Sequence, residues 1–208
     1  MDNAKNIKAI LFDLDGVLVD SFDAWLCAYN DTLQKFGKDG LEREKFRKEY
    51  WGLGLSENIE KLGLGKKAAE YCLSRYNVQT DKVKILPKAK ETLEILDKRK
   101  GLVTNTPKVP TEKILGNHDL DRYFEAVVSA DEVGKGKPAP DMIIEACKIL
   151  EVDPTEILLI GDSESDIKAC KKVGCNPIRI GSADDANFES IEELYKGLSE
   201  NNNLLTRK

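Results

Sequence analysis

The sequence lacks several features that would mark whole classes of protein. Its 208 residues include one histidine and five cysteines, which form no C-x-x-C pair. No apolar run approaches the roughly 18 residues that a membrane span needs, so no membrane association is expected. No long run of lysine and arginine occurs and the formal net charge is −5. Because nucleic acid is bound by clustered cations, a nucleic-acid partner is disfavoured. We expect the cysteines to be reduced thiols that mostly pack in the core of a cytoplasmic protein. Cys170 and Cys175 could form a redox pair, but no neighbouring feature of the sequence supports one.

What the chain does contain is an alternation of apolar strands and amphipathic helices. Hydrophobic residues make up 41% of the chain and charged residues 33%, which allows a packed core with a solvated surface. Short apolar runs predict strands at 7–13, 101–105, 126–129, 157–161 and 177–180. Apolar spacing predicts helices at 88–100, 141–150 and 190–198. This order predicts an α/β fold with a Rossmann-like parallel sheet flanked by helices.

The segment after the first predicted strand breaks this alternation. It holds no convincing strand, and glycines separate helical patterns at 23–36, 43–50, 56–62 and 66–76. We therefore predict a discontinuous catalytic core of residues 1–17 and 83–208 and an inserted helical cap of residues 18–82. Asp20 and Ser21 are expected to cap the first helix of the insertion.

Acidic and hydroxyl side chains stand where the predicted strands end. The residues at these positions are Asp13 and Asp15, Thr104 and Asn105, Lys137, and Asp162 and Asp166. Because the carboxyl ends of parallel strands meet at one edge of a sheet, these side chains should converge. Carboxylates so close together raise one another's pKa, and a divalent cation with oxygen ligands relieves their repulsion. Carboxylates, a cation and a lysine together suit a phosphate group.

Each of these features alone has an ordinary structural explanation. Asp-x-Asp-Gly is common in turns, and Gly-Asp-Ser is common at the start of a helix. A calcium loop is disfavoured because Val17, Leu18 and Val19 occupy positions where further oxygen ligands would be needed. The occurrence of all the features in this order, each at a strand end, favours a functional site.

Four segments resemble the motifs of the haloacid dehalogenase superfamily. They are DLDGVLVDS at 13–21, LVTNT at 102–106, KGKPAPD at 135–141 and IGDSESD at 160–166. The layout is similar to that of phosphoglycolate phosphatases, and the insertion is placed like their helical cap. The resemblance implies a magnesium-dependent phosphatase in which an aspartate carries the phosphoryl group covalently.

The resemblance also implies a role for each matching residue. The catalytic residues would be Asp13 as the nucleophile and Asp15 as the general acid and base. The substrate-binding residues would be Thr104, Asn105 and Lys137. The Mg2+ ligands would be Asp13, Asp15 through its carbonyl, and Asp162, with Asp166 orienting the metal's waters. Lys135 is a rival to Lys137 for the phosphate. Only residues 101–103 separate the predicted helix from Thr104, so an abrupt turn is expected there.

The expected reaction is hydrolysis of a small phosphorylated metabolite, and phosphoglycolate is one candidate. A sugar-phosphate mutase and an inorganic pyrophosphatase remain alternatives. A binding module without catalysis is disfavoured because Asp13, Asp15, Lys137 and Asp162 are all present. Residues 51–54 belong either to the cap core or to a loop that bends over the substrate and sets specificity. The sequence leaves monomer and homodimer both open.

Overall fold

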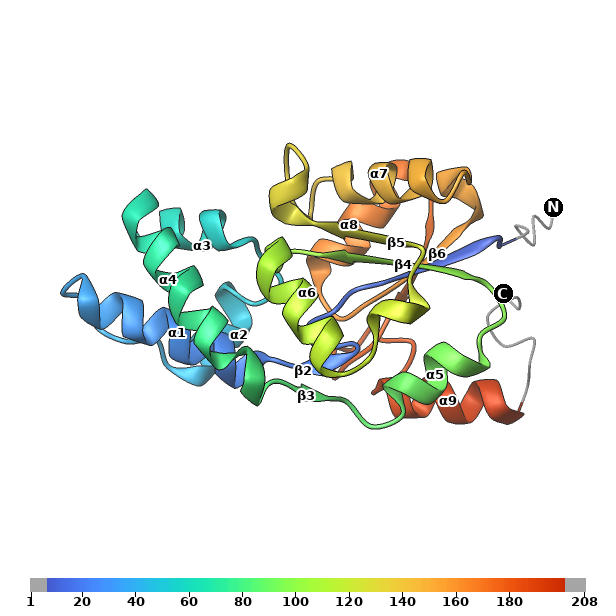
Figure 1. Ribbon diagram of the computed structural model, residues 1–208, viewed down its shortest axis with the longest axis horizontal. Helices are drawn as coiled ribbons and strands as arrows, with labels where there is room; N and C mark the ends of the chain where they lie inside the picture. Colours follow the sequence, from blue (N-terminus) through green and yellow to red (C-terminus); the bar gives the residue numbers. More distant parts are fainter. Residues whose placement is uncertain (1–6, 201–208) are drawn as a thin grey trace.

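The central feature of the computed structural model, which describes residues 7–200, is a parallel five-stranded sheet (Figure 1). Its strands are β1 (Ala9–Phe12), β4 (Arg99–Thr104), β5 (Ala126–Ser129), β6 (Ile157–Gly161) and β7 (Asn176–Arg179). Their order across the sheet is β5-β4-β1-β6-β7, and every neighbouring pair is parallel. The predicted α/β fold with a Rossmann-like sheet is confirmed.

Alternate residues of the strands face two different layers of helices. Ala9 and Leu11 of β1 belong to one apolar core, and Ile10 and Phe12 belong to the other. The first core lies under α7 (Asp141–Ile149) and α8 (Glu164–Val173), and the second lies over α5 (Ala89–Ile95), α6 (Lys108–Asn117) and α9 (Ile191–Glu200) (Figure 1). Burial of both faces explains why β1 and β6 are uninterrupted apolar runs.

The strand order creates one favoured place for a site. The chain builds the sheet outward from β1 to β4 and β5, then returns to the other side of β1 with β6 and β7. Ligands of such sheets bind beyond the carboxyl ends of the strands where the order reverses, which here lies between β1 and β6. Asp13 follows β1 and Asp162 follows β6.

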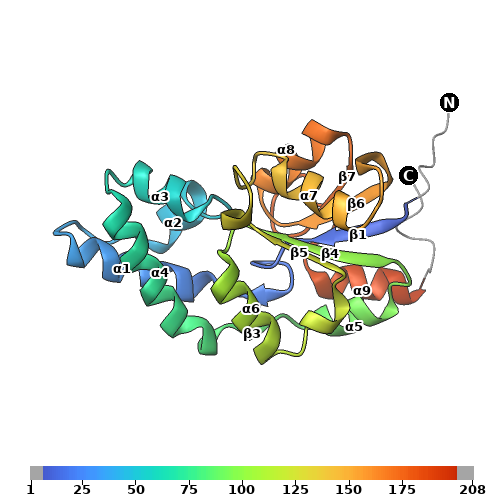
Figure 2. The same ribbon diagram turned by 45° about the horizontal axis from the view of Figure 1, so that its top comes forward.

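The helices of the insertion lie to one side of the sheet (Figures 1 and 2). They are α1 (Phe22–Lys35), α2 (Arg43–Glu49), α3 (Leu55–Lys61) and α4 (Lys66–Gln79). The rings of Trp25 on α1 and Tyr76 on α4 stack with centroids 3.6 Å apart. The chain enters and leaves the insertion through two short strands, β2 (Val19–Asp20) and β3 (Lys84–Ile85), which pair antiparallel. These strands were not predicted, because two residues are too few to show a pattern.

The predicted helix at 88–100 is wrong at its carboxyl end. The helix stops at Ile95, and Arg99 and Lys100 begin β4. The Arg99 guanidinium donates to Glu125 and to the Leu150 carbonyl, and Lys100 Nζ donates to the Leu96 and Lys98 carbonyls, so both charged side chains are accommodated at the amino end of β4. The strand is therefore six residues long, and the abrupt turn expected before Thr104 does not occur. Helices α6 and α8 were also missed.

The prediction of reduced thiols is wrong for two cysteines. The structure joins Cys170, near the end of α8, to Cys175 in a disulfide, whereas Cys27, Cys72 and Cys147 are free. Gly174 ends α8 with a positive φ of 73° and turns the chain back, so the two Cα atoms lie 5.1 Å apart. A spacing of five residues does not reveal this turn.

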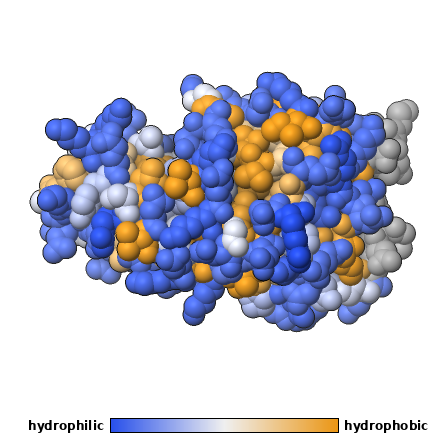
Figure 3. Space-filling view, viewed as in Figure 1, coloured by the Kyte–Doolittle hydropathy of each residue, from blue (hydrophilic) through white to orange (hydrophobic). Residues whose placement is uncertain are grey.

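The described part of the chain contains no helix that is both long and apolar enough to cross a bilayer. The face shown in Figure 3 is mainly hydrophilic, with apolar areas scattered between the polar ones.

Candidate active site

Asp13 lies at the carboxyl end of β1, close to the neighbouring strand. Its backbone N–H donates to the carbonyl of Ile160 in β6 at 2.9 Å. Its side chain is buried, and Oδ1 accepts hydrogen bonds from the Leu14 N–H at 2.8 Å and from Lys137 Nζ at 2.7 Å. Both bonds go to Oδ1, and Oδ2 makes no hydrogen bond within residues 7–200.

Lys137 is buried and uses all three of its N–H donors inside the protein. Its Nζ contacts Asp13 Oδ1 at 2.7 Å, Asp166 Oδ1 at 2.6 Å and the Val103 carbonyl at 2.9 Å. Burial alone would lower the pKa of Lys137, but the carboxylates of Asp13 and Asp166 outweigh burial and raise it. Lys137 therefore stays charged. Lys135, the rival in the sequence, lines an outer cleft instead.

Three carboxylates gather around this lysine. One oxygen from each of Asp13, Asp162 and Asp166 lies within 4.8 Å of the others. Oδ1 of Asp162 is buried and has no hydrogen-bond partner among the described residues. A buried unpartnered carboxylate oxygen beside two further carboxylates suits a small divalent cation. Asp166 belongs to this cluster, whereas the resemblance gives it the role of orienting the metal's waters. Its Oδ2 also accepts hydrogen bonds from the N–H and the hydroxyl of Ser163.

The proximity of these acids shifts their titration. Burial first, and Asp166 second, raise the pKa of Asp13 well above its ordinary value, although Lys137 opposes the shift. Burial and Asp166 also raise the pKa of Asp162 to about 7, against a hydrogen bond from Trp51 and the charge of Lys137. Without a cation, Asp13 and Asp162 therefore keep their protons to a higher pH in the folded chain than in the unfolded chain.

We expect the metal-free protein to lose stability as the pH rises through about 7. A carboxyl group with a raised folded-state pKa contributes stability at low pH, and this contribution is lost as the pH passes the folded pKa. Thermal unfolding in chelator at pH 5.5 and pH 8 should show a lower midpoint at pH 8, by on the order of 5 °C or more. Asp162→Asn should reduce the difference, because the amide does not titrate. Equal midpoints for the parent protein at both pH values would contradict the prediction.

Asp15 is held by hydroxyl groups from two other parts of the chain. Its Oδ2 accepts from Thr106 Oγ1 at 2.7 Å and from Thr104 Oγ1 at 3.3 Å, and its Oδ1 accepts from the Ser21 hydroxyl. Ser21 stands at the start of α1 but makes no side-chain cap there, so the predicted capping role is wrong. Its hydroxyl is used to hold Asp15 instead.

Thr106 and Thr104 differ in their access to the site. Thr106 lines the pocket, and Thr104 does not; Thr104 is fully buried, and its Oγ1 accepts the backbone N–H of Thr106 at 3.0 Å. Sequence reasoning missed Thr106, although the repeated threonine in Thr104-Asn105-Thr106 was visible.

Gly16 brings the Asp15 loop against the end of β6, since a Cβ at this position would lie 2.1 Å from Asp162 Oδ2.

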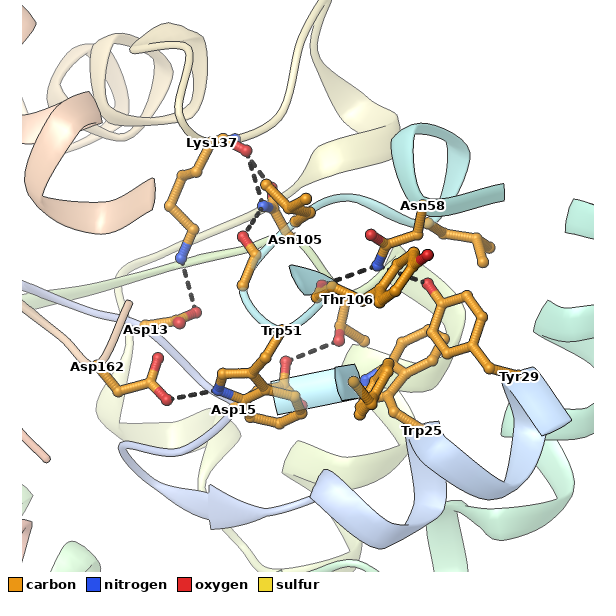
Figure 4. Close-up of a pocket in the computed structure, with 15 residues that line it drawn as sticks. Asp13, Asp15, Trp25, Tyr29, Trp51, Asn58, Asn105, Thr106, Lys137 and Asp162 are labelled. Atoms are coloured by element: carbon orange, nitrogen blue, oxygen red, sulfur yellow. Dashed lines mark hydrogen bonds and ion pairs between the residues drawn. The ribbon is translucent and has the colours of Figure 1, made fainter. Parts of the chain in front are cut away.

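The loop after α2 reaches from the insertion to the acidic cluster (Figure 4). Trp51 Nε1–H donates to Asp162 Oδ2 at 2.7 Å, and Asn105 Nδ2 donates to the Gly52 carbonyl at 2.9 Å. Gly52 has a positive φ of 80°, and a Cβ there would lie 2.5 Å from that of Ser163. Only glycine fits so close an approach. Asn105 thus links three segments, because it also bonds both backbone polar groups of Lys137.

A pocket remains between this loop and the strand ends. It has a cavity volume of about 40 Å³, room for a few waters. Its described lining is Asp13, Asp15, Trp25, Tyr29, Phe46, Tyr50, Trp51, Gly52, Leu53, Leu55, Asn58, Asn105, Thr106, Lys137 and Asp162. A larger cleft of about 790 Å³ runs alongside and shares Leu55, Asn105 and Lys137 with it.

Comparison with known proteins identifies the family. The model of the haloacid dehalogenase-like hydrolases matches residues 10–180. The chain is 33% identical over 176 residues to a phosphoglycolate phosphatase of Aquifex aeolicus, with 81% of this chain and 82% of the relative covered. It is 29% identical over 184 residues to a phosphorylated carbohydrates phosphatase of Thermotoga maritima, with 83% and 84% covered. It is similar in fold to a β-phosphoglucomutase structure from Clostridium difficile, at 22% identity and a TM-score of 0.81 over 97% of this chain and all of that one. The chain therefore belongs to the haloacid dehalogenase-like hydrolase family, as its motifs predict.

Proposed function

We propose that this protein is a magnesium-dependent phosphatase that hydrolyses small phosphomonoesters through a phosphoryl group carried on Asp13. The observation that carries the proposal is the state of the Asp13 carboxylate. Lys137 and the Leu14 N–H hold Oδ1, so that Oδ2 is left for attack at the edge of the pocket. An ionised carboxylate beside a buried cation is a competent nucleophile toward a phosphate whose charge is neutralised.

The first step transfers the phosphoryl group to the protein. Asp13 Oδ2 attacks phosphorus, and the bond from phosphorus to the ester oxygen breaks. The departing oxygen takes a proton from Asp15, whose carboxyl is held between Thr106 and Ser21 at the same pocket. The second step reverses these roles, since Asp15 accepts a proton from water as the water attacks phosphorus. The bond from phosphorus to Asp13 then breaks, and inorganic phosphate is released.

Neutralisation of the phosphate comes from two sources in this proposal. A magnesium ion held by Asp13, Asp162 and the Asp15 carbonyl, with Asp166 beside them, would supply charge neutralisation and fix the phosphate orientation. Lys137 supplies the second positive charge. To bind a phosphate oxygen, Lys137 must release one of its three present partners. The motifs place Thr104 and Asn105 beside it; Asn105 lines the pocket, whereas the buried Thr104 would have to become accessible to a phosphate.

The names of the relatives make phosphoglycolate and phosphorylated carbohydrates the first substrates to test. A mutase must also hold the second phosphate of a sugar bisphosphate and keep water from the phosphorylated aspartate. Of the described residues that line the pocket, none from the insertion is a cation. This favours release of the phosphoryl group to water over its return to a sugar.

The test is a panel of phosphomonoesters and pyrophosphate, assayed for phosphate release with magnesium and with chelator. A parallel reaction contains β-glucose 1-phosphate with a trace of the 1,6-bisphosphate and follows glucose 6-phosphate and free phosphate together. Magnesium-dependent release from monoesters would support the proposal. Glucose 6-phosphate appearing faster than phosphate would replace it with the mutase, and release from pyrophosphate alone would replace it with the pyrophosphatase.

We further propose that residues 18–82 form a cap that closes over the core of residues 1–17 and 83–208. Trp51→Phe should then lower kcat/KM about tenfold, because a hydrogen bond to a carboxylate contributes on the order of 1.5 kcal/mol. Phenylalanine retains ring packing against Phe22 and Phe46, whose centroids lie 5.1 and 6.2 Å from that of Trp51. Steady-state kinetics with a small monoester measure the effect. A kcat/KM within twofold of the parent would show that this bond does not contribute to closure.

A further inference from the structure

The pocket changes character from the core side to the side of the insertion. The strand ends supply its charges, namely Asp13, Asp15, Asp162 and Lys137. The insertion supplies a wall of aromatic and aliphatic side chains, namely Trp25, Tyr29, Phe46, Tyr50, Trp51, Leu53 and Leu55, together with the amide of Asn58. Figure 4 shows Tyr29 and Asn58 on the side of the pocket away from Asp13 and Lys137. A substrate with its phosphate at Lys137 therefore places its leaving group against this wall.

The amide of Asn58 has one fixed orientation. Its Nδ2 donates to the Tyr50 carbonyl at 2.9 Å and to the Tyr29 hydroxyl at 3.0 Å. A backbone carbonyl can only accept, so the NH2 group must face it and the amide cannot be reversed. Oδ1 is buried and has no partner within residues 7–200, and Asn58 is only 2% exposed. Buried amide oxygens normally accept a hydrogen bond, and Asn58 lines the pocket, so we take this oxygen as the acceptor for a donor on a ligand there.

Tyr29 offers the complementary group beside it. Its oxygen accepts from Asn58 Nδ2, which leaves the phenolic proton available to another acceptor. Burial raises the pKa of Tyr29, so the phenol stays protonated. One free acceptor next to one available donor matches an alcohol hydroxyl, which both donates and accepts.

We infer that the leaving group of the substrate is a small uncharged alcohol that carries a second hydroxyl besides the ester oxygen. Asn58 and Tyr29 bind this second hydroxyl, and the carbon skeleton packs against the aromatic wall. This inference rests on the proposed phosphatase function and excludes phosphoglycolate as the preferred substrate. A carboxylate can only accept hydrogen bonds, so it is repelled by Asn58 Oδ1. It would also lose its hydration without gaining a cation, since Lys137 is the only cation of the described pocket lining.

Two arginines of the insertion pack close to the aromatic wall, because Phe22, which they cover, contacts Phe46 and Trp51. The guanidinium groups of Arg43 and Arg47 on α2 lie over the ring of Phe22, 4.6 and 4.2 Å from its centroid. Arg43 is also paired with Asp23. Neither arginine lines the pocket.

The experiment compares two substrates that differ only at the end of the leaving group. These are 2-hydroxyethyl phosphate, which ends in a hydroxymethyl group, and phosphoglycolate, which ends in a carboxylate. We expect kcat/KM for 2-hydroxyethyl phosphate to be at least tenfold higher. Propyl phosphate, which has neither group, is the reference. Turnover with an equal or higher kcat/KM for phosphoglycolate would overturn the inference alone, whereas no magnesium-dependent turnover of any monoester would overturn the proposed function as well.

Two variants test whether Asn58 and Tyr29 bind the hydroxyl. Asn58→Leu and Tyr29→Phe should each lower the ratio of kcat/KM for 2-hydroxyethyl phosphate to that for propyl phosphate by about tenfold. The ratio is independent of the fraction of protein that folds, and Tyr29→Phe deletes a single oxygen. Arg47→Ala is the matched control and should leave the ratio unchanged. An unchanged ratio in both pocket variants, or a selective loss of phosphoglycolate turnover in Arg47→Ala, would contradict the inference.

Discussion

Asp13→Asn lowers kcat at least about a thousandfold if Asp13 is the nucleophile, since an amide oxygen does not attack phosphorus at a useful rate. The substitution is nearly isosteric and its oxygen can still accept from the Leu14 N–H and Lys137. The fold should therefore persist, as judged by circular dichroism. Phosphate release under saturating substrate and magnesium measures the loss. Activity within tenfold of the parent would remove Asp13 from this role.

A gain in stability should accompany the loss of activity. Burial and neighbouring acids raise the pKa of Asp13, so its charge is unfavourable in the metal-free protein at neutral pH. We expect Asp13→Asn to unfold at a higher temperature than the parent in chelator at pH 8. A matched Asp20→Asn variant, at an exposed position of β2, should change neither the activity nor the midpoint. Loss of activity together with a lower midpoint would indicate unfolding instead of a lost nucleophile.

The acidic side of the site could be predicted because it depends on local sequence and one topological rule. Asp13 follows a buried apolar run and Asp162 follows another, and parallel pairing of β1 with β6 brings the ends of these runs together. The contribution of the insertion could not be predicted in this way. Trp51 contacts a residue 111 positions away, and nothing near Trp51 in the sequence indicates that partner.

The hydroxyl groups around Asp15 show a different limit of the sequence. Ser21 was predicted to cap a helix because serine before an amphipathic segment is usually a cap. The structure places it at that position but turns its hydroxyl to Asp15, since a turn closed by hydrogen bonds from the Gly16 N–H to the Val19 carbonyl and from the Val19 N–H to the Leu14 carbonyl returns the chain to Asp15. Local propensity gave the position of Ser21 correctly, but its partner depends on tertiary contacts.

Removal of divalent metal should abolish turnover, and this prediction follows from the charges around Lys137. Asp13, Asp162 and Asp166 offer oxygens within 4.8 Å of one another, and one lysine faces the group. A phosphate dianion adds further negative charge at the same place, so binding without a cation is strongly opposed. We expect phosphate release to fall at least a hundredfold in chelator and to return with magnesium. Calcium should inhibit, because it takes more oxygen ligands and can occupy the oxygen that attacks phosphorus.

Metal binding can be measured without the reaction, which separates the ion from the substrate. Magnesium should raise the unfolding midpoint of the parent protein in a concentration-dependent way, because a ligand of the folded state stabilises it. Asp162→Ala removes the carboxylate whose Oδ1 is buried without a partner among the described residues, so it should weaken this stabilisation more than it raises KM at saturating magnesium. Asp20→Asn again serves as the matched control. Full turnover in chelator, or an Asp162→Ala variant stabilised by magnesium as well as the parent is, would show that this cluster does not hold the ion on which the proposed mechanism depends.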